Sequence, residues 1–149
     1  MTLKQKIHQH YSQLVQDKID AFRDRIEALT EDSKNDAKGS AGDKHETTLS
    51  MMHIEQEKLN HKLAEFLAQK AVLDKINPES TGSKIVLGSL VQANNMKLYI
   101  ASALPKITVD GETIIAVSLQ SPLGSALLGK EVGFNFEINT SAFLVESID

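Results

Sequence analysis

The first thirty residues carry an uninterrupted apolar repeat, which limits the fold more than any other feature of the chain. Apolar side chains recur at steps of three or four residues from Leu3 to Leu29, and no Gly or Pro breaks the run. From Val15 to Leu29 the steps are 4, 3, 4 and 3 residues, the heptad pattern of a coiled-coil seam. We therefore predict one amphipathic helix over residues 2–30, with Thr2 as its N-cap.

A second repeat of the same kind runs from about Thr47 to Ile76 and predicts a second long helix. Asn77-Pro78 ends this helix, because the residue before Pro is driven out of the helical conformation. The segment Glu31–Glu46 between the two helices is polar and poor in side chains that could pack. We expect the helices to form an antiparallel hairpin, a coiled coil with arms roughly 45 Å long. The predicted seam of the second helix is Leu49, Met52, Leu59, Leu63, Phe66 and Leu73.

Charge divides the chain into two parts. Of its 149 residues, the first 80 carry 12 Lys+Arg and 14 Asp+Glu, whereas residues 81–149 carry only 4 and 6. Gly and Pro are concentrated in the second part instead. The length suits one domain or two small ones. We predict a helical hairpin over residues 1–78, with an acidic tip near residues 42–46, and a second domain over residues 79–149.

Composition excludes several classes of protein. The chain has no Cys, so it has no disulfide, thiol nucleophile or thiolate metal site. Its net charge of −4 argues against a basic protein that neutralises nucleic-acid phosphates. No apolar run reaches the roughly 18 residues that a membrane span needs, and the polar first ten residues lack a secretory core. We expect a cytoplasmic protein that does not engage a membrane.

Residues 84–149 contain short stretches rich in β-branched residues, which predict strands. Asp110-Gly111 is a strong signal for a hairpin turn between two of them. One short helix is well marked, because Ser121 can cap it, Pro122 suits its first position and Gly129 can end it. We predict a small α+β domain with an antiparallel sheet and one short helix. The predicted strands are Lys84–Val91, Lys97–Ala103, Lys106–Val109, Thr113–Val117, Val132–Ile138 and Ala142–Ile148.

Two carboxylates, Asp43 and Glu46, stand three residues apart at the end of the polar segment. If the second helix starts near Asp43, both lie on one face and could bind one hard divalent cation through oxygen. Asp43 could also be an N-cap with Glu46 as its capping-box partner, and the two roles are compatible. A further set, His53, Glu57 and His61, has a helical spacing that can ligate a metal, although His among Glu and Gln is also common on helix surfaces.

The second part of the chain lacks a catalytic constellation. No His follows His61, which excludes a Ser-His pair within this domain, and no phosphate-binding Gly loop occurs. Its four basic residues are too few for a groove that follows a phosphate backbone. We therefore expect a binding or docking module, and a protein that is not an enzyme in its own right.

Two stretches of the sequence are similar to those of a known family. Residues 121–133 match every defined position of the run S-P-L-G-x-A-L-L-G-K-x-V-G, and residues 42–46 match G-D-x-x-E. Both are typical of the Gre family of bacterial transcript cleavage factors, GreA- and GreB-like proteins. The chain resembles this family over nearly its whole length, most specifically in the C-terminal half.

The resemblance implies a fold, a partner and a mechanism. The C-terminal domain would be FKBP-like and would dock on bacterial RNA polymerase at the mouth of its secondary channel. The hairpin of a monomer would thread toward the active centre. There Asp43 and Glu46 would help to hold a second Mg²⁺, bound weakly by the free protein, so that the polymerase cleaves the 3′ end of backtracked RNA. The implied docking residues are Ser121, Pro122, Leu123, Gly124, Leu127, Leu128 and Gly129.

Two other functions stay open. After Glu46 the chain has Thr47-Thr48-Leu49-Ser50, where the family usually has Asn-Ala-Glu-Tyr. A regulator that occupies the polymerase channel without promoting cleavage is therefore one alternative. The other is a structural coiled-coil adaptor, unrelated to transcription, that associates through the seam from Val15 to Leu29.

Overall fold

The computed structural model describes the backbone of residues 1–39 and 43–149, and the side chains of residues 1–35 and 47–149. The chain divides into two compact units. One unit contains Gln13–Lys70, and the other combines Met1–Ser12 with Ala71–Asp149. Of the helices in the described residues, none has the length and apolar character that a membrane span requires.

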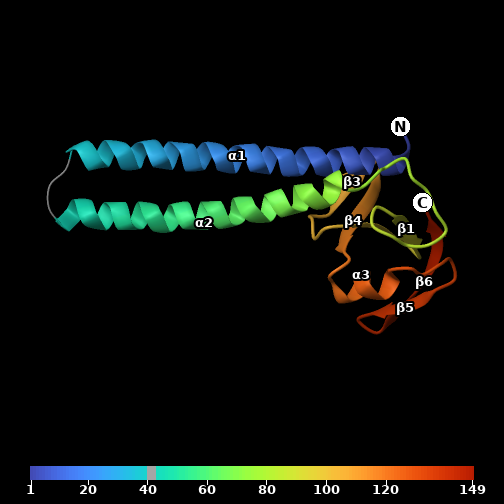
Figure 1. The fold of residues 1–149 in the computed structure, drawn as a ribbon. Coiled ribbons are helices and arrows are strands. Elements are labelled where there is room, and N and C mark those ends of the chain that lie inside the picture. The colour runs from blue at the N-terminus through green and yellow to red at the C-terminus, as the bar shows by residue number, and fades with distance from the viewer. Residues whose placement is uncertain (40–42) are drawn as a thin grey trace. The chain divides into compact units, whose positions relative to one another are not determined.

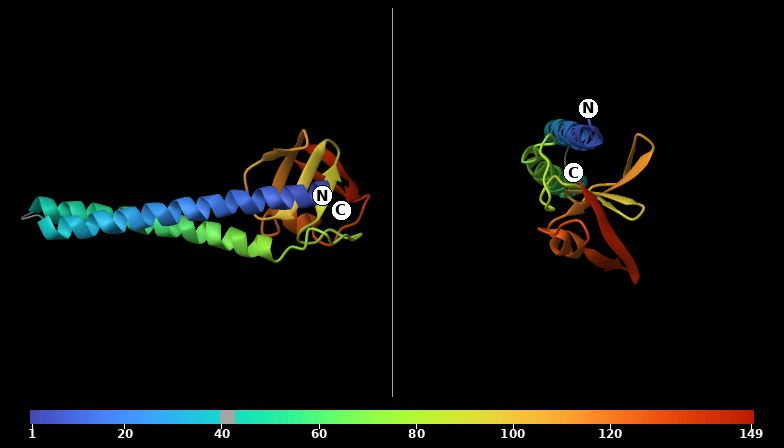
Figure 2. Two further views of the ribbon diagram at one scale, coloured as in Figure 1. Left: turned by 90° about the horizontal axis from the view of Figure 1, so that it is seen from above. Right: turned by 90° about the vertical axis from the view of Figure 1, so that its right-hand side faces the viewer.

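Two long helices, α1 (Leu3–Gly39) and α2 (Asp43–Asp74), form the predicted hairpin and run side by side in both Figure 1 and Figure 2. The N-cap prediction for Thr2 is confirmed. The Gln5 backbone N–H donates to Thr2 Oγ1 at 3.1 Å, and the Thr2 N–H donates to Gln5 Oε1 at 2.9 Å. These two bonds form a reciprocal capping box, which satisfies N–H groups that the helix start would otherwise leave unpaired.

The polar segment between the helices is shorter than predicted. We expected residues 31–46 to connect the helices, but α1 continues through Gly39 and α2 begins at Asp43. The additional helical residues, 31–39 and 43–46, are mostly charged or small, and no Pro interrupts them. A helix can continue through such residues without a packed face, because its charged side chains are solvated and its backbone hydrogen bonds are internal.

The predicted seam packs as expected within the unit Gln13–Lys70. Val15 and Ile19 of α1 are buried, as are Leu59 and Phe66 of α2. The rings of Phe22 and Phe66 meet edge to face, with centroids 5.2 Å apart. Such aromatic pairs stabilise a contact beyond the area that they bury.

Six strands form one sheet in the order β3-β4-β2-β1-β6-β5. The predicted α+β class is confirmed, but the sheet is mixed, because β2 and β4 are parallel, with Tyr99 opposite Ala116. After β2 the chain forms β3 at the edge of the sheet. It then turns back as β4, which is antiparallel to β3 and lies between β3 and β2, parallel to β2. The strands are β1 (Leu90–Ala93), β2 (Met96–Ala101), β3 (Ile107–Val109), β4 (Glu112–Ser118), β5 (Asn135–Ile138) and β6 (Ser141–Ile148).

The first predicted strand, Lys84–Val91, is wrong over most of its length, since β1 begins only at Leu90. Gly88 has a φ of +91°, a conformation that breaks an extended strand. The Ile85 backbone instead bonds to the segment after the short helix, through Gly129 N–H and Lys130 C=O. By contrast, the Asp110-Gly111 turn is confirmed, because both residues have positive φ and they join β3 to β4.

The sheet is covered on both faces. On one face, α3 (Pro122–Leu127) packs its buried Leu127 against a core that includes Leu98 and Ile100 of β2. Figure 1 shows α3 beside the strands. Since successive strand residues point to opposite faces, Tyr99 faces the other side, where Tyr11 of α1 stacks on it at 6.1 Å.

Candidate functional site

The predicted acidic site lies at the turn of the hairpin. The helix α2 begins at Asp43, so Asp43 and Glu46 both stand in its first turn, three residues apart. Their side chains lie outside the described residues, and neither the capping nor the metal-binding role is tested. The start of α2 at Asp43 agrees with the start of the second helix that both roles require.

The alternative set, His53, Glu57 and His61, is exposed along α2. The His61 Nε2 lies 3.7 Å from the Glu65 Oε1. Among the residues whose side chains are described, no group of three or more His, Cys, Asp or Glu is arranged to hold a metal ion. A metal site at this position therefore finds no support.

The short helix α3 is capped as the sequence predicted. Ser121 Oγ accepts from the Gly124 N–H at 3.0 Å and donates to the Ser118 carbonyl at 2.7 Å. Pro122 occupies the first helical position, and Gly129 follows with a φ of +78°. The cap ties α3 to the end of β4 and fixes where the motif lies on the sheet.

The seven predicted docking residues differ in burial: two are buried, Ser121 and Leu123 are half-buried, and the other three, Pro122, Leu128 and Gly129, are exposed. Gly124 and Leu127 are buried, so these two hold the domain together. Pro122 and Leu128 are exposed, and Leu128 exposes 48% of its surface. Docking through this motif stays a prediction, and only its exposed residues could contact a partner directly.

Two more exposed apolar side chains belong to segments that border α3. Val86 is 52% exposed and Val132 is 59% exposed. Main-chain bonds from Ile85 N–H to the Lys130 carbonyl, and from Gly129 N–H to the Ile85 carbonyl, connect these segments. Leu128, Val86 and Val132 are therefore the large exposed apolar side chains in and beside this motif.

The contact between the first three turns of α1 and the sheet was not predicted. Ile7 and Tyr11 are fully buried, and Tyr11 donates its hydroxyl hydrogen bond to the Pro105 carbonyl at 2.8 Å. His8 Nδ1 lies 2.8 Å from the Tyr99 hydroxyl. A signal was present in the sequence, because Leu3, Ile7, Tyr11 and Val15 lie four residues apart in succession, without the alternation of a heptad, and Leu14 adds a further apolar position.

Burial sets the ionisation of this cluster. It lowers the pKa of His8 below its usual value, against the opposing effect of the Asp74 carboxylate. It raises the pKa of Tyr11 to about 12 and also raises that of Tyr99. The two phenols and the imidazole are therefore neutral near pH 7, as hydrogen-bonded groups packed at a buried contact should be.

Comparisons with known proteins add little. No family model matches the chain, and no curated protein does so either. The chain is similar to a solved structure described as that of the transcription factor Gfh1, with 20% sequence identity over 92% of each chain and a TM-score of 0.35. At that identity and TM-score, the likeness does not establish a shared function.

Proposed function

We propose that this protein is a transcription elongation factor that binds bacterial RNA polymerase through its secondary channel and promotes cleavage of backtracked RNA. The observation that carries the proposal is the start of α2 at Asp43, which puts Asp43 and Glu46 of the G-D-x-x-E pattern in the first turn of the second hairpin helix. The S-P-L-G-x-A-L-L-G-K-x-V-G run in the sheet unit supports it independently.

The hairpin has the properties that such a role needs. At 1.5 Å per residue, the 32-residue α2 is about 48 Å long. Val15, Ile19, Leu59 and Phe66 of the hairpin seam are buried. Most of the hairpin's exposed side chains are polar or charged, with Met51, Ile54 and Leu67 as exposed apolar side chains of α2, and such a surface suits a water-filled passage. Stiffness is required because a displaced tip would lose the positioning on which the chemistry depends.

The donor chemistry of the tip fits Mg²⁺. Asp43 and Glu46 offer only carboxylate oxygens, which are the ligands that this hard cation prefers. When bound, a second Mg²⁺ stabilises the charge that develops on the attacking and leaving oxygens during phosphodiester hydrolysis. Two carboxylates leave most of the coordination shell to other ligands, so we expect the free protein to bind the ion weakly.

Asp43→Asn and Glu46→Gln test the proposal in a stalled elongation complex. Each substitution keeps the size of the side chain and removes one charged oxygen ligand. We expect each to slow cleavage of the RNA 3′ end at least about tenfold, while binding to the polymerase is unchanged. The readouts are the rate of RNA shortening on a gel and the amount of protein retained on the polymerase.

Glu55→Gln is the matched control, because Glu55 is an exposed carboxylate of the same helix, three turns from the tip. This variant should promote RNA cleavage by the polymerase as fast as the wild type does. If the double variant at positions 43 and 46 also promotes cleavage at the wild-type rate, the assigned role of the tip is wrong.

The residues after Glu46 favour a second candidate function. Thr47, Thr48 and Leu49 bring no further carboxylate or aromatic group to the tip. Wild-type protein that binds the polymerase but leaves backtracked RNA intact would identify a channel-occupying regulator. Protein that does not bind the polymerase, and self-associates instead, would identify a coiled-coil adaptor.

A further inference from the structure

A cavity of about 360 Å³ lies in the sheet unit, between the first turn of α1 and the segment after α2. All of its lining residues belong to Met1–Ser12 or Ala71–Asp149, so the cavity is formed within one compact unit. Its volume is near the lower end of the range for small-molecule sites, which suits a compact ligand.

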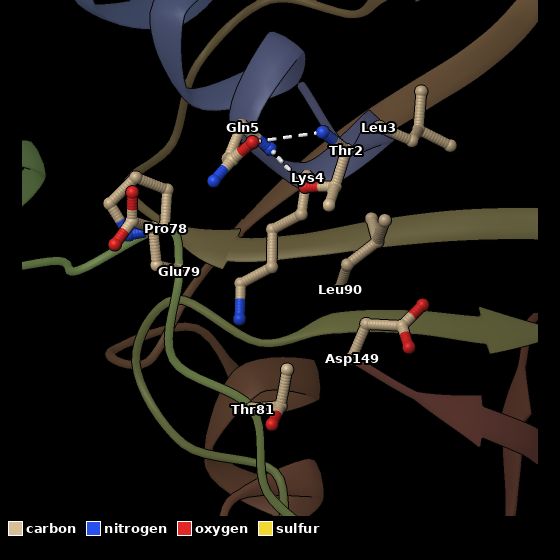
Figure 3. Close-up of a pocket in the computed structure, with 9 residues that line it drawn as sticks. All are labelled: Thr2, Leu3, Lys4, Gln5, Pro78, Glu79, Thr81, Leu90 and Asp149. Carbon is tan, nitrogen blue, oxygen red and sulfur yellow. Dashed lines mark hydrogen bonds between the residues drawn. The ribbon is translucent and has the colours of Figure 1, made fainter.

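A buried ammonium group points into this cavity. Lys4 is only 6% exposed, and Figure 3 shows its side chain crossing the cavity with the Nζ near the centre. The Nζ donates one hydrogen bond, to the Ser80 carbonyl at 2.6 Å. An ammonium has three donors, so the capacity of Lys4 for hydrogen bonds is not exhausted.

The same cavity is lined by acceptors. The side chains of Glu79, Thr81 and Asp149 also line the cavity, and in Figure 3 Asp149 lies on one side of Lys4 while Glu79 lies on the other, next to Pro78. Within the described residues, no hydrogen bond or ion pair occupies their side-chain oxygens. Burial lowers the pKa of Lys4, and the Asp149 charge opposes this effect. The cavity is therefore lined by one buried cationic group, Lys4, and by two exposed anionic groups, Glu79 and Asp149.

The remaining walls are apolar. Leu3, Pro78 and Leu90 lie on three sides of the cavity. A simple anion would meet two carboxylates as well as Lys4, and a simple cation would meet the ammonium. A ligand with a negative charge, a positive charge and a short apolar group would match the ammonium, the carboxylates and the apolar side chains that line the cavity.

We infer that this cavity binds a small zwitterion of the amino-acid type. The ligand carboxylate accepts hydrogen bonds from Lys4 Nζ, its ammonium faces Asp149, and its apolar side chain contacts Leu3 and Leu90. The site is separate from the tip carboxylates, and the inference does not depend on the role of the hairpin in transcription.

Titration of the ¹⁵N-labelled full-length chain with L-leucine tests the inference. We expect saturable amide shifts, in the millimolar range, at Lys4, Thr81 and Leu90. Two probes of matched shape each lack one charge. These are 4-methylpentanoate, which has no ammonium, and 3-methylbutylamine, which has no carboxylate. Each should bind at least about tenfold more weakly than leucine, because one buried charged partner is left unmatched.

Lys4→Met and Asp149→Asn should each weaken leucine binding at least about tenfold. Lys6→Met is the matched control, because Lys6 pairs with Asp110 at 2.8 Å and does not line the cavity. Asp149 is exposed, so its variant keeps the test valid if Lys4→Met unfolds the unit. Absence of saturable shifts with leucine would overturn the inference, as would equally tight binding of either probe with a single charge.

Discussion

Gly124 occupies a position where a side chain does not fit. A Cβ built on it would lie 1.9 Å from the Ser118 carbonyl oxygen and 2.9 Å from the Leu119 Cα. The obstacles are backbone atoms, so they cannot rotate away as a flexible side chain could. The close approach of α3 to the end of β4 therefore depends on this glycine, as does the Ser121 cap that accepts from its N–H.

Gly124→Ala should destabilise the sheet unit by about 1–3 kcal/mol, because α3 must move away from β4 to admit the methyl group. Urea denaturation followed by circular dichroism measures the change. Gly82→Ala is the control, since a Cβ there meets nothing within 4 Å and the change should be close to neutral. If the two variants have equal free energies of unfolding, the close approach of α3 to β4 does not contribute to stability.

At the scale of elements, local chemistry explains which predictions succeeded. The caps of α1 and α3 and the Asp110-Gly111 turn were predictable because each depends on residues within three or four positions of one another. The parallel pairing of β2 with β4 was not, because it depends on which strand takes the sheet edge. The role of Asp43 and Glu46 at the tip stays a prediction from the sequence, whereas the Lys4 cavity could not be predicted because segments far apart in the sequence form it.

One polar pair interrupts the apolar seam of the hairpin. Gln56 Nε2 donates to Thr30 Oγ1 at 3.0 Å, and this hydroxyl donates in turn to the Ile26 carbonyl at 2.9 Å. Both side chains are half-buried. A polar pair at such a position fixes the register of two helices, because any slip would leave its donors without partners.

Thr30→Val should destabilise the hairpin by about 1–3 kcal/mol, because it keeps the shape of the side chain but leaves the Gln56 amide without its partner. Chemical denaturation, with helical ellipticity as the signal, measures the loss. The double variant Thr30→Val with Gln56→Leu should recover most of that loss, since neither polar group then remains. If the double variant is no more stable than the single one, the pair does not act as a unit.

At the scale of the whole molecule, α1 belongs to both compact units. Its first three turns pack on the sheet, and its later turns form the hairpin with α2. The buried contact at His8 and Tyr99 is therefore part of the sheet unit, although His8 belongs to a hairpin helix. Its neutral imidazole makes the stability of this unit sensitive to acid.

We predict that stability falls as the pH drops below about 6.5, the ordinary pKa of an unfolded His. Because the folded-state pKa of His8 is lowered, the unfolded chain binds the proton first, and protonation favours unfolding. Denaturation midpoints from pH 7.5 to pH 5.5 measure the effect.

His8→Gln should reduce this pH dependence, whereas His10→Gln, an exposed change on the same helix, should not. A slope unchanged by His8→Gln would assign the acid sensitivity to other groups.

The contact between α1 and the sheet also sets an order of events on the ribosome. Tyr11 and its partner Pro105 are 94 residues apart in the chain. At roughly 5–20 residues per second, the partner emerges about 5–20 s after Tyr11. During that interval the helix end that carries Ile7 and Tyr11 has no sheet to cover it. The nascent chain therefore displays an apolar surface that the finished protein hides, and a chaperone could recognise it there.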